Sequence, residues 1–199
     1  MSRGLAGVVL ALASLLVAAT AVWLFRQRAE NASQEAAVVD GATPVLAAPA
    51  GDRTMLLFPG PDGQLHREVR DIELDGDVLA RAAQVVGALL EGPRTEGLLP
   101  LLPPGTELLQ VIPGAPGVVY LDLRAPSDPK ALAMGSRQEL VTVYGLVDSL
   151  VLNVPGLSAV GFLWSGTQAL SFAGHVDTTV PLAPDTSLVA EPAAATGGG

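Results

Sequence analysis

The chain has 199 residues, with 20 acidic against 11 basic side chains and a formal net charge of -9. It contains no cysteine, which excludes disulfides, thiolate nucleophiles, cysteine zinc sites and a lipid attached through an N-terminal cysteine. All the acidic residues follow Arg28, so the later part of the chain is strongly acidic and should be repelled by phosphate groups. We therefore expect no nucleic-acid partner.

Residues 1–28 are predicted to form an N-terminal membrane anchor. No charged residue occurs from Leu5 to Phe25, and a helix of that length, at roughly 1.5 Å per residue, would cross a hydrocarbon core of about 30 Å. Trp23 lies near the expected membrane interface, and arginines follow it. A cleaved signal peptide is the alternative: Ala19-Thr20-Ala21 fits a small-x-small cleavage site, although the apolar stretch is longer than a cleavable one usually is.

One folded domain, residues 54–183, is predicted between a linker and a tail. Residues 29–53 are rich in Ala, Val, Pro and Gly without a sustained period, which is typical of a flexible linker. Residues 184–199 are rich in Pro, Ala and Gly and are predicted to be a disordered tail. Positive charges flank the apolar stretch almost equally, so the positive-inside rule does not decide which side of the membrane the domain occupies.

The first half of the domain predicts two strands and a helix. Met55–Phe58 is predicted as a short apolar strand, Pro59–Gly63 as a turn, and Leu65–Ile72 as an edge strand. An aspartate pair ending at Asp77 offers cap oxygens to a following helix, whose apolar residues recur at helical spacing. Gly92-Pro93 cannot continue this helix and ends it.

An irregular, proline-containing stretch and a hairpin follow. The leucines of Leu98–Pro104 are predicted either to pack onto the domain or to form an exposed apolar loop that docks a partner. Glu107–Ile112 and Val118–Leu123 are predicted as the two strands of the hairpin.

A second helix is predicted from Ser136. Ser136 and Glu139 have the spacing of a capping box, in which the carboxylate reaches back to the helix start. The apolar face of this helix comprises Leu140, Val143, Tyr144, Val147, Leu150 and Val151. Pro155-Gly156 stops it, and the alternation of Val160, Phe162 and Trp164 predicts a buried strand before a tight turn.

Four segments, in this order, resemble the GerMN domain family, named after a bacterial spore-germination protein. They are ALLEGP (Ala88–Pro93), LLPPGTELL (Leu101–Leu109), VVYLDL (Val118–Leu123) and GSRQELVTVYGLVDSL (Gly135–Leu150). The stretch GHVDTTVPL (Gly174–Leu182) is similar to the closing part of the family's domain. The resemblance covers roughly residues 54–182.

The resemblance implies an α/β (α+β) fold in which two helices pack on a small mixed β-sheet. It also implies export, or attachment at the outer face of a bacterial cytoplasmic membrane, and work in sporulation, germination or other envelope processes. In this family the domain serves assembly and interaction rather than catalysis. Members often carry a lipid-anchored cysteine or tandem domains, whereas this chain has a predicted membrane helix and one copy.

Isolated carboxylates and two histidines are the only candidates for catalytic chemistry. Two carboxylates across a cleft would be needed for glycan hydrolysis, and the candidates are Glu91, Asp122, Glu139, Asp148 and Asp177. Each is expected to be a solvated or capping residue. His66 is predicted to be a solvated strand residue and His175 to make a local backbone bond at a turn. Without cysteines the two form a poor zinc site, so no metal or cofactor is expected.

Together these features predict a single-pass protein of the bacterial cytoplasmic membrane with an extracytoplasmic GerMN-type interaction or assembly domain. Its partners would be envelope proteins or peptidoglycan, it would have no enzymatic activity, and sporulation or germination is the process in question. An exposed sheet edge or the Leu98–Pro104 loop is the expected partner surface. The alternative is an envelope hydrolase that acts on peptidoglycan through acidic residues.

Overall fold

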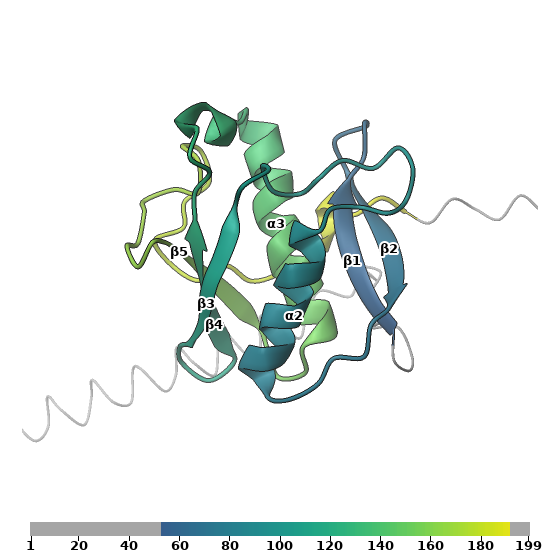
Figure 1. The fold of residues 1–199 in the computed structure, drawn as a ribbon, viewed down its shortest axis with the longest axis vertical. Coiled ribbons are helices and arrows are strands. Elements are labelled where there is room, and N and C mark those ends of the chain that lie inside the picture. The colour runs from purple at the N-terminus through teal and green to yellow at the C-terminus, as the bar shows by residue number, and fades with distance from the viewer. Residues whose placement is uncertain (1–52, 192–199) are drawn as a thin grey trace, which may run out of the picture. The chain divides into compact units, whose positions relative to one another are not determined.

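The computed structural model describes residues 53–191 (Figure 1). The predicted membrane anchor and the linker up to residue 52 lie outside the described residues. Within 53–191, the helices are too short or too polar to span a membrane.

Five strands form two separate sheets rather than the single mixed sheet that was predicted. β1 (Arg53–Pro59) and β2 (Leu65–Asp71) make an antiparallel hairpin with Arg53 opposite Asp71. β3 (Glu107–Pro113), β4 (Val118–Arg124) and β5 (Ala159–Trp164) make a mixed sheet in the order β3-β4-β5. β3 runs antiparallel to β4, and β5 runs parallel to it.

Two α-helices contact both sheets. α2 (Val78–Leu90) packs against β1 and β3, and α3 (Ser136–Asn153) packs against β1 and β5. Figure 1 shows both helices between the hairpin on the right and the three-stranded sheet on the left. Two short 3-10 helices, Pro129–Leu132 and Thr186–Leu188, complete the described elements. The fold is thus α+β, as the sequence predicted, with its helices in contact with two small sheets.

Side chains of α3 take the place of a third strand beside β1. The backbone N–H of Met55 donates to Asn153 Oδ1 at 2.9 Å, and that of Leu57 donates to Ser149 Oγ at 3.0 Å. Buried backbone donors need partners, and here a helix supplies them. These donors on the edge of β1 therefore have partners without a further strand on that side.

The ends of α2 follow the sequence prediction. Asp77 is the N-cap residue, and its side chain accepts from the backbone N–H of Ala80 at 2.9 Å. Gly92 follows the helix with a φ of 83°, a left-handed conformation that glycine adopts without strain.

Helix α3 begins at the predicted residue but without the predicted capping box. Its N-cap residue is Gly135, which has no side-chain cap bond. Glu139 is fully buried and bonds to a distant loop, described below, so it does not reach back to the helix start.

The core extends around α3 beyond the predicted stripe. Of the predicted apolar face, Val143, Val147 and Leu150 are fully buried, whereas Leu140, Tyr144 and Val151 are half-buried at its margin. Val141 and Leu146 are buried as well. The reason is that strands of two different sheets cover the helix, so more than one stripe faces the interior.

Residues 184–191 are packed against the domain, in contrast to the disorder predicted for them. Leu188 is buried, Val189 bridges to Leu65, and the backbone N–H of Ala190 donates to Leu65 O at 2.8 Å. Arg67 also donates to the Ala190 carbonyl. Composition alone suggested a tail, but the two apolar side chains find a place in the core. Residues 192–199 lie outside the described residues.

Replacing Ser149 tests the contact between α3 and β1. In Ser149→Ala the buried N–H of Leu57 loses its acceptor, so the free energy of unfolding should fall by about 1–3 kcal/mol. Ser158→Ala is the control, because the exposed Ser158 hydroxyl donates to Gly117 at the surface, and its effect should stay within about 0.5 kcal/mol. Urea unfolding of both variants measures the difference, and equal effects would contradict this role of Ser149.

Candidate functional site

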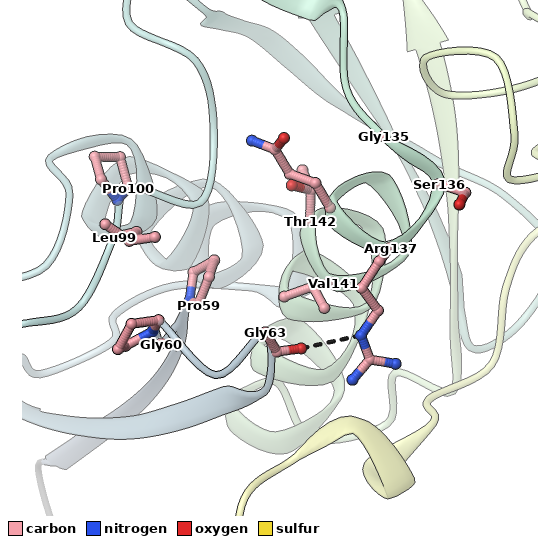
Figure 2. Close-up of a pocket in the computed structure, with 12 residues that line it drawn as sticks. Pro59, Gly60, Gly63, Leu99, Pro100, Gly135, Ser136, Arg137, Val141 and Thr142 are labelled. Carbon is pink, nitrogen blue, oxygen red and sulfur yellow. Dashed lines mark hydrogen bonds between the residues drawn. The ribbon is translucent and has the colours of Figure 1, made fainter.

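A pocket of about 510 Å³ lies at the start of α3, and we call it the α3 pocket (Figure 2). Three segments form it: the turn after β1, the stretch before β3, and the first two turns of α3. Its lining residues are Pro59, Gly60, Pro61, Gly63, Leu99, Pro100, Gly135, Ser136, Arg137, Gln138, Val141 and Thr142. Its volume is within the range of small-ligand and peptide sites.

Hydrogen bonds hold the three segments of the α3 pocket together. The backbone N–H of Leu99 donates to Pro59 O at 2.8 Å, and Arg137 Nε donates to Gly63 O at 3.1 Å. The Thr142 hydroxyl donates to Leu101 O at 3.1 Å. The pocket is therefore formed before any ligand arrives.

The leucines of the stretch Leu98–Pro104 are partly buried and partly exposed. Leu101 and Leu102 are buried in the core, as expected if the leucines pack onto the domain. Leu99, in contrast, is 51% exposed and lines the α3 pocket with Pro100. Leu101 and Leu102 thus anchor the stretch in the core, and Leu99 presents apolar surface at the pocket.

The charge of the α3 pocket comes from Arg137 alone. None of its lining residues is acidic, although the chain as a whole is. The Arg137 side chain is exposed, and within residues 53–191 no carboxylate lies within ion-pair distance of it. Arg137 donates through Nε to Gly63 O, so the outer edge of the guanidinium, which carries the two terminal nitrogens, points away from Gly63, as Figure 2 shows.

A smaller hollow of about 320 Å³ adjoins the α3 pocket. It is lined by Ser136, Arg137, Leu140, His175 and Val176. Ser136 and Arg137 line both hollows, so the two hollows meet at the first turn of α3.

Glu139 fastens the loop after β5 to α3. Its carboxylate accepts from the backbone N–H groups of Ala173 at 2.7 Å, His175 at 2.9 Å and Val176 at 2.9 Å, and from His175 Nδ1 at 2.8 Å. Burial alone would raise the pKa of Glu139, but these hydrogen bonds outweigh it and hold the pKa below its usual value. The predicted capping role is therefore wrong. So is the predicted local backbone bond of the His175 ring, which binds Glu139 instead.

Asp148 is a second buried carboxylate on α3. Its Oδ1 accepts from the backbone N–H of Asp185 at 2.9 Å, whereas Oδ2 has no partner among the described residues. Burial raises the pKa of Asp148 to about 7, and the neighbouring Asp185 carboxylate adds to the rise. Tyr144 is itself partly buried, and this burial, together with the negative charges of Asp185 and Asp148, raises the pKa of Tyr144.

The other three carboxylate candidates also have structural partners. Asp122 is buried and accepts from the Gly166 N–H at 2.7 Å, which holds the turn after β5. Glu91 pairs at the surface with Arg94 at 3.1 Å. Asp177 accepts from the backbone and hydroxyl of Thr179, which lower its pKa. Among residues 53–191, no three His, Asp or Glu side chains are grouped so that they could hold a metal ion.

His66 has a partner that the sequence analysis did not name. Its Nε2 lies 3.0 Å from Asp62 Oδ2 in the turn between β1 and β2, where both side chains are partly exposed. The predicted position of His66 in a strand is confirmed.

The sequence matches the Germane family, described as sporulation and spore germination, over residues 56–170, which is more than half of the chain. The chain belongs to the Germane family. The resemblance to GerMN domains is thereby confirmed. No curated protein matches the sequence.

Two solved structures of GerMN domains show the same fold. The first GerMN domain of the sporulation protein GerM from Bacillus subtilis has a TM-score of 0.54 and 14% identity, covering 66% of this chain and 96% of that one. The tandem GerMN domains of the same protein give the same score and identity, and the match spans 45% of their length. A candidate lipoprotein from Clostridium perfringens has a TM-score of 0.48 and 19% identity, covering 71% of this chain and 98% of that one.

One buried ion pair of this Germane-family chain was missed in the sequence. Arg70 contacts Glu68 at 2.6 Å, and both side chains are at most 5% exposed. Arg70 also donates to the carbonyls of Ala88 and Gly92, and Glu68 accepts from the backbone of Thr95. Together they fix the end of α2 to β2. Two charges at alternate positions on one strand face are the signal for this pair, which was read as an exposed edge.

Glu139→Gln should lower the free energy of unfolding by at least about 3 kcal/mol, because several charge-assisted hydrogen bonds to one buried carboxylate are weakened together. Amide exchange at residues 173–176 should rise in parallel. Because the folded pKa is lowered, the contribution is present above the ordinary glutamate pKa of 4.5 and is lost as pH falls through the folded pKa. Glu107→Gln, in an exposed pair with Arg124, is the control and should cost less than about 1 kcal/mol. Similar costs for the two variants would show that Glu139 has no special role.

Asp148 should give the domain a stability that falls with rising pH. Between the unfolded value of 3.8 and about 7, the folded state holds a proton that the unfolded state has released. The free energy of unfolding therefore decreases across that window. In Asp148→Asn this part of the decrease should be absent, whereas Asp177→Asn should keep it. Denaturant unfolding from pH 4 to pH 8 measures both, and an unchanged slope in Asp148→Asn would contradict the assignment.

Proposed function

We propose that this chain is a membrane-tethered interaction domain of the bacterial cell envelope, without a catalytic cycle, and that a partner protein docks at its α3 pocket. The Germane family's description, sporulation and spore germination, gives the process in which such a domain would work. The membrane tether rests on the apolar stretch Leu5–Phe25, and the placement of the domain outside the cytoplasmic membrane rests on the family resemblance.

The observation that carries the proposal is that the candidate carboxylates have structural partners within the domain, whereas the α3 pocket contains no carboxylate. Every one of the five candidate carboxylates has a hydrogen-bond or ion-pair partner within the domain. The α3 pocket, in contrast, is lined largely by prolines, glycines, Leu99 and Val141 and contains neither a carboxylate nor a histidine. A hollow of that composition suits recognition of apolar groups better than acid–base chemistry.

The alternative, an envelope hydrolase, is favoured by one specific contact. Glu139 holds one nitrogen of the His175 ring, an arrangement that orients a general base in hydrolases. The ring is 47% exposed and faces the smaller hollow with Ser136. Against this alternative, both oxygens of Glu139 also accept hydrogen bonds from backbone N–H groups. Holding the loop at residues 173–176 is therefore a sufficient role for Glu139.

Site-specific crosslinking in cells tests the proposal. A photoreactive amino acid in place of Leu99 should capture an envelope protein, because this side chain lines the α3 pocket and is half exposed. The same residue in place of Leu109, on the edge strand β3, tests the other predicted surface, and in place of Val69 on β2 it provides a control with similar exposure.

Three results would count against the proposal. Capture at Leu109 but not at Leu99 would move the partner surface to the sheet edge. Equal capture at Leu99 and Val69 would mean that no specific surface is used. Turnover of purified peptidoglycan by the full-length protein, lost in His175→Ala at an unchanged melting temperature, would favour the hydrolase instead.

A further inference from the structure

The α3 pocket is an acid-free region on an acidic chain. Twenty acidic residues are spread over residues 29–199, yet none lines the α3 pocket or the smaller hollow beside it. The nearest turn contains Asp62, but that side chain accepts from Gln64 N–H and contacts His66. Among the lining side chains only Arg137 is charged, and no described carboxylate lies within ion-pair distance of it.

Most of the remaining lining consists of prolines, glycines and aliphatic side chains, and it is rigid. Pro59, Pro61 and Pro100 have fixed φ angles, and Val141 lies in the fully formed helix α3. No aromatic side chain is present to stack on a sugar ring, and four polar side chains are few for a ligand covered with hydroxyl groups. The lining thus matches a ligand with apolar side chains and one negative group.

The described chain neither begins nor ends at the α3 pocket. β1 starts at Arg53 and reaches the pocket at Pro59, a distance of about 20 Å for six residue steps at roughly 3.3 Å each. The C-terminal segment runs parallel to β2 from Leu65 toward Arg67, which is away from Gly63 at the pocket. Neither described end lies in the pocket, and the charge of Arg137, unpaired among the described residues, favours an occupant that supplies a carboxylate.

We propose that the α3 pocket binds an extended peptide segment of a partner protein in which a carboxylate lies beside apolar residues. The apolar side chains contact Leu99, Pro100 and Val141, and the carboxylate pairs with the outer edge of the Arg137 guanidinium. This assignment rests on the proposed function and specifies the partner's chemistry. An Arg fork and a carboxylate form a directional pair, so Arg137 would set the register of the peptide while the apolar contacts supply most of the affinity.

Peptide arrays test this chemistry with the full-length protein in detergent. One array carries Asp at a fixed central position among randomised apolar residues and proline, and matched arrays carry Asn or Lys there. Wild-type protein should be retained on the Asp array roughly fivefold more than on the Asn array, the gain expected from one exposed ion pair. It should be retained least on the Lys array.

Two substitutions and one matched control separate charge from packing. Arg137→Glu should reverse the preference so that the Lys array retains more protein than the Asp array. Leu99→Asp should reduce retention on all three arrays by roughly tenfold or more, because it places an acid on the apolar wall. Arg81→Glu is the control: Arg81 also donates through Nε to a glycine carbonyl, at 3.0 Å, but on α2 and outside both hollows, so the wild-type preference should remain. Unchanged melting temperatures confirm that the variants are folded.

Each contrary outcome has a definite meaning. Equal retention on the Asp and Asn arrays, or a preference that Arg137→Glu leaves unchanged, would overturn the carboxylate assignment. No retention on any array, while Leu99 still captures a partner in cells, would overturn the peptide proposal and leave the proposed function standing. A dimer that Arg137→Glu disrupts in sedimentation, or a Leu99 crosslink to this chain's own residues, would overturn it in favour of a second copy or an internal segment.

Discussion

The domain depends on polar side chains along helix α3 that bond to the backbone of segments far away in the sequence. Ser149 and Asn153 bind the edge of β1, Glu139 binds the loop at residues 173–176, and Asp148 binds the segment that begins at Asp185. Thr142 adds a bond to the carbonyl of Leu101. A buried polar group without a partner costs free energy, so each of these bonds restricts its segment to one position. The helix is therefore both an apolar core element and the hydrogen-bond partner of four separate parts of the chain, accepting from three of them and donating to the Leu101 carbonyl.

This arrangement explains why acidic residues do not converge on a cleft. Glu139 and Asp148 lie in the interior, where their oxygens meet backbone N–H groups rather than each other. Their environments differ in one respect that matters for charge. Four donors hold the Glu139 carboxylate, which keeps it ionised, whereas a single donor reaches Asp148, so burial dominates there.

The same arrangement leaves the first turn of α3 open. Since Glu139 is engaged with the 173–176 loop, it does not return to the helix start, and no side chain caps Gly135. The surface around that turn is built instead from the β1–β2 turn and from Leu99 and Pro100, which backbone bonds hold in place. A preformed apolar surface loses little conformational entropy on binding, which is an advantage for an interaction domain.

Local chemistry in the sequence determined the element boundaries and the family. The Asp77 cap, the glycine at residue 92 and the Pro155-Gly156 stop act within one or two turns of the chain, so they can be recognised without a partner.

The tertiary structure alone decided which partners the polar side chains bind. The spacing of Ser136 and Glu139 fits a capping box, but a loop more than thirty residues later offers three backbone N–H groups and a histidine, and that set of donors is stronger than one local N–H. The division into two sheets and the packing of residues 184–191 were likewise decided by α3 and Leu65, because hydrogen bonds between distant segments leave no periodic signal in the sequence.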